Sequence, residues 1–251
     1  MIKGLYAAAS AMISGVFRQQ AVAHDIANVD TPGFKQILTT LSDFDTTSAY
    51  TQPLQSSSSS PSYLGELGLG VMASPAETDF SQGTLKTTDS SLDFAIQGSG
   101  FFRIRTPDGI RYTRDGRFNR DASGQLVTVD GNPVLNDSNQ VIKLAEGSVS
   151  VTPDGTIYVN GATSGKIGLA TFTDLTTLTR EDQNTFSSTA TPTTTGGGQI
   201  LQSVLEQSNV DSAKLMTQMI EISRSYQAAQ QMVQNQDELL GKAISTLGRV
   251  S

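Results

Sequence analysis

The feature that most constrains the fold is an apolar stripe with heptad spacing at each end of the chain. In the first stripe the positions alternate by three and four residues from Ile2 to Ile26, and only Gln19 is polar. In the last stripe they alternate in the same way from Leu215 to Leu247, and only Gln236 is polar. Apolar residues at this spacing lie along one helix face and form the seam of a coiled coil. The sequence therefore predicts a long amphipathic helix at each terminus.

Local signals predict where these helices begin and end. We expect the first helix to end near Asn28, because the residue before Pro32 avoids the helical region and Gly33 supplies a turn. The side chain of Asn209 or Asp211 can cap the start of the last helix by accepting a hydrogen bond from a free backbone N–H.

Between the helices the pattern changes to short β-like runs separated by turn residues. Turn sequences such as Pro107-Asp108-Gly109, Asp130-Gly131 and Pro153-Asp154-Gly155 recur in this region. Apolar runs of three to six residues bounded by such turns are typical of β-hairpins. The strands are expected at residues 92–96, 101–105, 110–113, 125–129, 149–151 and 157–159. The middle of the chain is therefore predicted to be a small all-β domain.

The predicted fold class is α+β, with terminal helices that pair as a coiled coil and an all-β, hairpin-rich domain between them. We expect the chain to be divided as follows: 1–35 with 200–251 as the helical domain, 36–75 as a connector with a Ser-rich loop, 76–186 as the β domain, and 187–199 as a Thr/Gly-rich linker. A fragment of about residues 70–200 is expected to fold alone.

Composition excludes several classes of function. The formal net charge is −7, whereas proteins that bind duplexes usually carry a basic stripe, so we expect no nucleic acid partner. The absence of cysteine excludes disulfides and cysteine-based metal sites. No run approaches the roughly 20 apolar residues of a membrane span, so no membrane insertion is expected. Gly4 and Ser10 interrupt the N-terminal apolar run, which continues into a polar helix, so no cleaved signal peptide is expected.

Candidates for catalysis are few, and we expect no catalytic residue, metal site or cofactor. The single histidine, His24, precedes Asp25, and a surface or interface role is the simpler interpretation. Residues 161–166 have glycine spacing one residue too short for a phosphate-binding loop, so a hairpin turn is the better interpretation. Six arginines between Arg103 and Arg120 form either a solvated face or an electrostatic contact with acidic neighbours.

Four motifs, in order along the chain, carry a family likeness. AAASAM…RQQAVAHDIANVDTPGFK resembles the N-terminal signature of flagellar axial proteins, and SLDFAIQGSGFFRI resembles the block that opens the β domain of rod and hook subunits. YTRDGRFNRDASGQLVTVDGNPVL resembles the hairpins that follow, and LEQSNVDSAKLMTQMIEISRSYQAAQQMV resembles the C-terminal signature. One departure is His24-Asp25, where family members often have paired asparagines.

The resemblance implies a structural subunit of the bacterial flagellar basal-body rod, whose terminal helices form an inner tube. It implies export by the flagellar type III apparatus without a cleaved signal, and a place in the basal body within the periplasm and cell envelope. It further implies, as partners, copies of the chain, other rod and hook proteins, and surrounding ring (bushing) proteins. The length favours a rod subunit. LGELGLGV resembles distal-rod subunits, whereas the C-terminal AISTLGRVS leaves a proximal-rod subunit open.

The two stripes are the predicted assembly interface, because a pair of helices alone would leave other apolar side chains, such as Phe17 and Ile220, uncovered. The predicted interface residues are Leu5, Ala9, Met12, Val16, Ala23, Ile26, Leu215, Met219, Ile222, Tyr226, Ala229, Val233, Leu240, Ala243 and Leu247. We expect Ile222 to be partly exposed in the free subunit. The alternative function is a hydrolytic or binding accessory of the cell wall, which would need paired carboxylates in a cleft.

Overall fold

The computed structural model describes residues 2–43, 46–50, 63–68, 70–74, 77–182, 184–193 and 197–247. The chain divides into two compact units. The helical unit contains Met1–Ile26, Ile37–Glu77 and Ser212–Ser251, and the β unit contains Ala27–Gln36 and Thr78–Asp211. The predicted α+β class is confirmed, with a helix near each terminus and a β-rich region between them.

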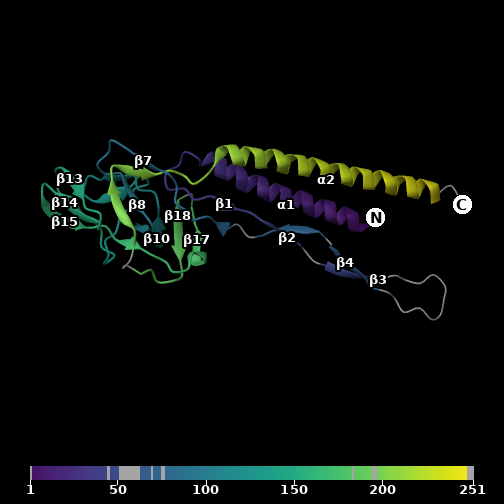
Figure 1. Cartoon of the computed structure of the whole chain (residues 1–251), viewed down its shortest axis with the longest axis horizontal. Helices are drawn as coiled ribbons and strands as arrows, with labels where there is room; N and C mark the ends of the chain where they lie inside the picture. The colour runs from purple at the N-terminus through teal and green to yellow at the C-terminus, as the bar shows by residue number, and fades with distance from the viewer. Residues whose placement is uncertain are drawn as a thin grey trace. The chain divides into compact units, whose positions relative to one another are not determined.

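The helical unit contains two long helices and several short strands. Its elements are α1 (Ile2–Ala27), β1 (Ile37–Leu38), β2 (Leu41–Asp43), β3 (Thr46–Tyr50), β4 (Tyr63–Gly68), β5 (Val71–Ala73), β6 (Glu77–Thr78) and α2 (Ser212–Leu247), with the last residues of α1 and β6 falling in the β unit. The two helices lie side by side (Figure 1). A Cβ at Gly4 would lie 3.4 Å from the Gln236 side chain, and one at Gly15 would lie 3.8 Å from the Tyr226 ring. Because the sequence numbers run in opposite directions along these contacts, the helices are antiparallel.

The helix ends follow the predicted signals in part. α1 ends at Ala27, and the following turn is closed by a bond from the Thr31 amide to the Asn28 carbonyl oxygen at 3.2 Å. α2 begins at Ser212, directly after Asp211. The other candidate cap, Asn209, has a different role, since its Oδ1 accepts from the Gln36 amide at 2.7 Å.

The segment predicted to be a connector contains antiparallel strand pairs. β2 pairs with β5 and β3 pairs with β4 in this way, while β1 pairs with β6, which lies just beyond the predicted connector. The tip of the predicted Ser-rich loop, at 51–62, lies outside the described residues. Short strands with mixed polarity give little hydropathy signal, so the sequence analysis did not predict these strands.

The β unit is built from small antiparallel sheets. Its elements are β7 (Leu85–Thr87), β8 (Phe94–Gln97), β9 (Phe101–Thr106), β10 (Gly109–Thr113), β11 (Phe118–Arg120), β12 (Leu126–Thr128), β13 (Val149–Val151), β14 (Thr156–Val159), β15 (Ala162–Lys166), β16 (Leu169–Ala170), the 3-10 helix η1 (Leu175–Thr177), β17 (Leu178–Arg180), β18 (Thr185–Ser188), β19 (Gln199–Gln202) and β20 (Val204–Glu206). The largest sheet has the order β16-β9-β10-β18-β17, and another has the order β13-β14-β15. β19 pairs with β8 and β20 with β7, which joins distant parts of the sequence.

The predicted strands and turns of the β domain are confirmed. β9 and β10 meet at the Pro107-Asp108-Gly109 turn, and β13 and β14 meet at Pro153-Asp154-Gly155. The 161–166 segment was predicted to be a hairpin turn, but only Gly161 lies in the turn, and Ala162–Lys166 form strand β15 against β14.

Two clusters of buried side chains form the core of the β unit. The first contains Phe94, Ile96, Phe102, Ile104, Phe118, Leu126, Val134, Ile142, Leu144, Ile157, Val159, Ile167 and Ile200. The second contains Phe101, Tyr112, Ala170, Phe172, Leu178 and Phe186. At roughly 1.5–3 kcal/mol for each large side chain, these clusters supply a core within the unit itself.

A buried group of charges also stabilises the β unit. Lys35 Nζ lies 2.5 Å from Glu206 Oε1, and an Arg114 guanidinium nitrogen lies 3.1 Å from Glu206 Oε2. All three residues are buried. Burial lowers the pKa values of Lys35 and Arg114, while the negative charge of Glu206 opposes both shifts. Sequence reasoning missed this group because Lys35 and Glu206 are far apart in the chain.

Candidate assembly surface

The predicted interface positions on α2 lie on its less exposed side. Leu215 and Ile222 are buried. The predicted α2 positions of intermediate exposure are Met219, Tyr226, Ala229, Val233, Leu240 and Ala243. The side chain of Leu247 lies outside the described residues. The expectation that Ile222 is partly exposed in the free subunit is wrong, because it is only 3% exposed within this chain.

The predicted positions on α1 are less uniform. Residues of intermediate exposure are Leu5, Ala9, Met12 and Ile26, whereas Val16 and Ala23 are exposed. The face of α1 that approaches α2 carries Gly4 and Gly15, one residue before Leu5 and Val16. Glycine has no side chain and so permits close contact between the helices. For the same reason, a hydropathy pattern cannot show that the helices approach each other at these glycines.

Large apolar side chains remain exposed on both helices. We call this set the exposed apolar surface: Tyr6, Ile13, Val16 and Phe17 on α1, and Met216, Ile220, Met232, Leu239 and Ile244 on α2. On α1, Tyr6, Ile13 and Phe17 have spacings of seven and four, which places them on one helix face. A patch of this kind on a soluble protein marks an interaction surface.

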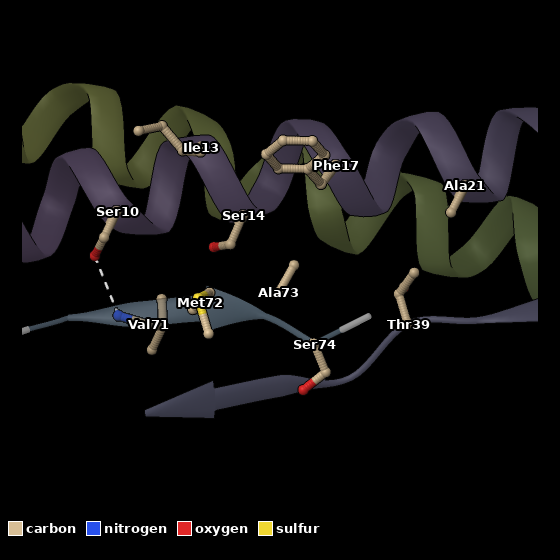
Figure 2. Close-up of a pocket in the computed structure, with 10 residues that line it drawn as sticks. All are labelled: Ser10, Ile13, Ser14, Phe17, Ala21, Thr39, Val71, Met72, Ala73 and Ser74. Atoms are coloured by element: carbon tan, nitrogen blue, oxygen red, sulfur yellow. Dashed lines mark hydrogen bonds between the residues drawn. The ribbon is translucent and has the colours of Figure 1, made fainter. Parts of the chain in front are cut away.

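A groove of about 450 Å³ lies beside this part of α1. Its walls are one side of α1, strand β5 and Thr39 (Figure 2). Ser10 Oγ accepts a hydrogen bond from the Val71 amide at 3.1 Å, which fixes β5 against the helix. Ile13, Phe17 and Met72 line the groove, and each is at least 48% exposed. None of the described residues that line it has an ionisable side chain, so the groove suits an apolar occupant.

The ionisable residues singled out in the sequence have partners within their own unit. Both carboxylate oxygens of Asp25 accept from the Ile37 amide, at 3.1 and 3.2 Å. Among the six arginines, Arg103 and Arg114 are buried. The bonds of the six are Arg103 to the Asn139 side chain, Arg105 to the Asn139 carbonyl oxygen, Arg111 to Glu181, Arg114 to Glu206, Arg117 to Asp115 and Arg120 to the Ala145 carbonyl oxygen. The six arginines, which are close together in the sequence, therefore bind different partners in the fold.

Two kinds of feature are absent from the described ranges. Among these residues no three or more His, Asp or Glu side chains come together as metal ligands. Within the same ranges neither long helix has an apolar stretch that could span a bilayer.

Two family models match the chain. The model described as the flagellar hook protein FlgE/F/G D1 domain matches residues 95–159, within the β unit. The model described as the flagellar basal body rod FlgEFG protein C-terminal matches residues 201–246, which include most of α2.

Curated relatives match over nearly the whole length. The flagellar basal-body rod protein FlgF of Caulobacter vibrioides is 35% identical, over 92% of this chain and 91% of its own. FlgG of Bacillus subtilis, also a basal-body rod protein, is 32% identical over 98% of this chain and 99% of its own. FlgF of Rhizobium meliloti is 34% identical over 99% of both chains. This chain therefore belongs to the family of flagellar basal-body rod proteins.

Proposed function

We propose that this chain is a structural subunit of the flagellar basal-body rod that assembles through the exposed apolar surface of its helical unit. The observation that carries the proposal is the contrast in burial among large apolar side chains. In the β unit they are concentrated in two buried clusters, whereas α1 and α2 leave residues such as Phe17 and Ile220 more than half exposed.

The energy of assembly then comes from covering these side chains. Each large apolar side chain that becomes fully buried contributes roughly 1.5–3 kcal/mol. The groove beside α1 can receive such side chains from a neighbour, because Ile13, Phe17 and Met72 line it. Helices that are marginal in the free subunit thus gain their core from neighbouring subunits.

In the finer form of the proposal, α1 and α2 pair as a coiled coil and contribute to an inner tube. The predicted interface residues, from Leu5 to Leu247, belong to the packed layer of this tube. The organisation that goes with it has residues 1–35 and 200–251 as the helical domain, 76–186 as the β domain, and 36–75 and 187–199 as connections. The assembled rod acts as the drive shaft that passes motor torque to the hook.

The proposed partners are further copies of this chain and other rod and hook subunits. Ring proteins that surround the rod and the flagellar type III export apparatus are the further partners proposed. The proposed location is the basal body within the periplasm and cell envelope. The relatives named FlgF and FlgG are both basal-body rod proteins, and they support a place in the rod without distinguishing its proximal from its distal part.

A hydrolytic role at the cell wall has no support. The relatives with almost full-length similarity are named as rod proteins. The groove described above is lined by apolar and hydroxyl side chains, whereas glycoside hydrolysis requires two carboxyl groups facing one bond.

The test compares two substitutions of similar chemistry in the two units. Ile220→Asp places a carboxylate on the exposed apolar surface, and Val129→Asp places one on the β unit; these residues are 55% and 56% exposed. Neither change buries a charge in the free subunit. In the assembled rod, Ile220→Asp would bury one without a partner, which costs several kcal/mol.

The readouts are motility and the amount of subunit in isolated basal bodies. We expect cells with Ile220→Asp to be non-motile, with the subunit absent from basal bodies, and cells with Val129→Asp to swim. Normal incorporation of the Ile220→Asp subunit would show that the exposed apolar surface is not buried in the rod.

A further inference from the structure

The short segment after α1 is bonded into the β unit along its length. The Asn184 side chain donates to the Pro32 carbonyl oxygen at 3.0 Å, and the Gly33 amide donates to the Glu206 carbonyl oxygen at 2.7 Å. Phe34 is completely buried, with the Arg180 guanidinium 4.8 Å from its ring centroid. Such dense bonding fixes the conformation of residues that otherwise only connect elements.

Glycine permits this close packing at Gly33. Its φ is +71°, a conformation that side chains disfavour. A Cβ at this position would lie 2.4 Å from the Asp115 amide nitrogen. The segment therefore passes directly against the backbone of the β unit.

The buried charges lie where this segment meets the strand that leads to α2. Lys35 Nζ donates to Glu206 Oε1 and, at 2.7 Å, to the Ser81 carbonyl oxygen. Arg114 binds the other carboxylate oxygen of Glu206, and the Gly83 amide donates to Oε1 at 3.0 Å. One carboxylate thus joins three segments of the chain. Leaving it without a buried cation would be costly, because an unpaired buried charge is strongly destabilising.

A ring of hydrogen bonds joins three of the places where the chain passes between units. The chain leaves the β unit after Gln36, returns at Thr78 and leaves again after Asp211. Near these points the Gln36 amide donates to Asn209 Oδ1 at 2.7 Å, and Asn209 Nδ2 donates to the Asp79 carbonyl oxygen at 2.9 Å. The Asp79 amide donates to the Gln36 carbonyl oxygen at 2.9 Å, which closes the ring.

We propose that Lys35, Glu206, Arg114 and the Asn209 ring form a clamp that makes these chain crossings move as one body and so transmits torque between the helices and the β unit. The torque-transmitting role rests on the proposed rod function. The clamp itself is a property of the single chain. A force on α1 enters the β unit through residues 27–36, and a force on α2 enters it through residues 204–211, so bonds between these segments share the load.

The first test is hydrogen exchange on the full-length monomer with Lys35→Met. This change keeps an unbranched chain of similar length and removes one of the two cations that bind Glu206; Arg114 remains. The clamp predicts that exchange of the Gly33, Gln36 and Asp79 amides, which donate within it, accelerates together, and by about tenfold or more beyond any acceleration of the β9 and β10 amides. The control is Lys166→Met, which removes an exposed lysine 3.6 Å from Asp137 and should change none of these rates.

Two results would overturn the clamp. If only the Gly33 amide changes while those of Gln36 and Asp79 keep their protection, the crossings do not act as one body. If exchange accelerates uniformly through β9 and β10, Lys35 serves the general stability of the unit.

The second test measures motility under load with Asn209→Ala, which removes the side chain at the centre of the ring. We expect isolated basal bodies to contain as much of the variant subunit as of the parent. Cells with the variant should swim almost as fast as the parent in dilute medium and should not swim at high viscosity. Equal swimming speed at both viscosities contradicts the clamp, and so does absence of the variant from basal bodies. This outcome is separate from that of Ile220→Asp, which tests assembly alone.

Discussion

The two units of this chain satisfy their apolar side chains in different ways. The β unit buries its large aromatic residues, such as Phe102 and Phe186, completely. The helical unit exposes Tyr6, Ile13 and Phe17 on α1 and a comparable set on α2. A unit with its own core can fold as a monomer, whereas a unit with uncovered apolar faces depends on neighbours for part of its stability. This difference agrees with the proposal that assembly covers the apolar faces of the helical unit, whereas the β unit has its own core.

The charged side chains also differ in burial between the two units. In the β unit the buried charges of Lys35, Arg114 and Glu206 are paired with one another and with backbone groups. Within the described part of α2, Lys242 and Glu238 form an exposed salt bridge of 3.8 Å. Exposed pairs of this kind contribute about 0.3–0.5 kcal/mol. Among the described residues, buried ion pairing thus lies in the β unit, whereas the pair on α2 is solvated.

The largest effect on this contrast should come from removing residues 27–36 from the β unit. The test compares two fragments. The longer one joins residues 27–36 to residues 79–211 through a short glycine-rich turn, and the shorter one is residues 78–211 alone. The turn can span the junction because the Asp79 amide donates to the Gln36 carbonyl oxygen. The shorter fragment loses the buried Lys35–Glu206 pair, at about 3–5 kcal/mol, and the burial of Phe34, at about 1.5–3 kcal/mol.

Urea denaturation of the two fragments measures this difference. The fragment 70–200 expected from the sequence lacks both Lys35 and Glu206, so it should behave like the weaker of the two. Equal unfolding midpoints would mean that residues 27–36 are not part of the folded β unit.

A smaller effect should come from truncating one aromatic ring in each unit. Phe118 is 1% exposed and contacts the rings of Phe94 and Phe102, so Phe118→Ala should lower the free energy of unfolding of the monomer by about 3–5 kcal/mol. Phe17 is 59% exposed, so Phe17→Ala should change it by less than about 0.5 kcal/mol. Thermal denaturation measures both, and effects of similar size would remove the distinction between the units.

The smallest effect concerns acid stability of one turn in the β unit. The hydroxyls of Thr152 and Thr156 bond to Asp154 and lower its pKa to about 2. Because this pKa lies below the unfolded value of about 3.9, the stabilisation is complete above that value and is lost as the pH falls toward 2. The melting temperature of Asp154→Asn should therefore lie slightly below that of the parent at pH 6 and equal it near pH 2. A constant difference across this range would contradict the assignment.

Much of the fold could be predicted from the sequence, because its signals are local. Heptad spacing marked both helices, and turn residues such as Asp108-Gly109 and Asp154-Gly155 marked the hairpins of the β unit. The pairing of β20 with β7 and of β19 with β8 could not be predicted, because it joins strands that are more than 100 residues apart. Nothing local in either strand specifies its partner.

The candidate site was predicted less completely. Hydropathy identified residues such as Phe17 and Ile220 as apolar positions that a helix pair leaves uncovered, and both are exposed. It placed the helix contact of α1 one residue away from Gly4 and Gly15, because glycine carries no hydropathy signal. Hydropathy also gave no indication that Lys35 and Glu206 are buried. Lysine and glutamate usually lie on the surface unless they are paired, and the sequence does not show that these two residues meet.

Hydrogen exchange on the full-length subunit, at a concentration where sedimentation shows a monomer, tests the contrast between the units most directly. We predict strong protection of amides in β8, β9 and β10 and weak protection across residues 5–26 and 215–247, because only the β unit has a complete core. After assembly into rods the same helical amides should become protected. Strong protection of both helices in the proven monomer would contradict the claim that neighbouring subunits complete the helical unit.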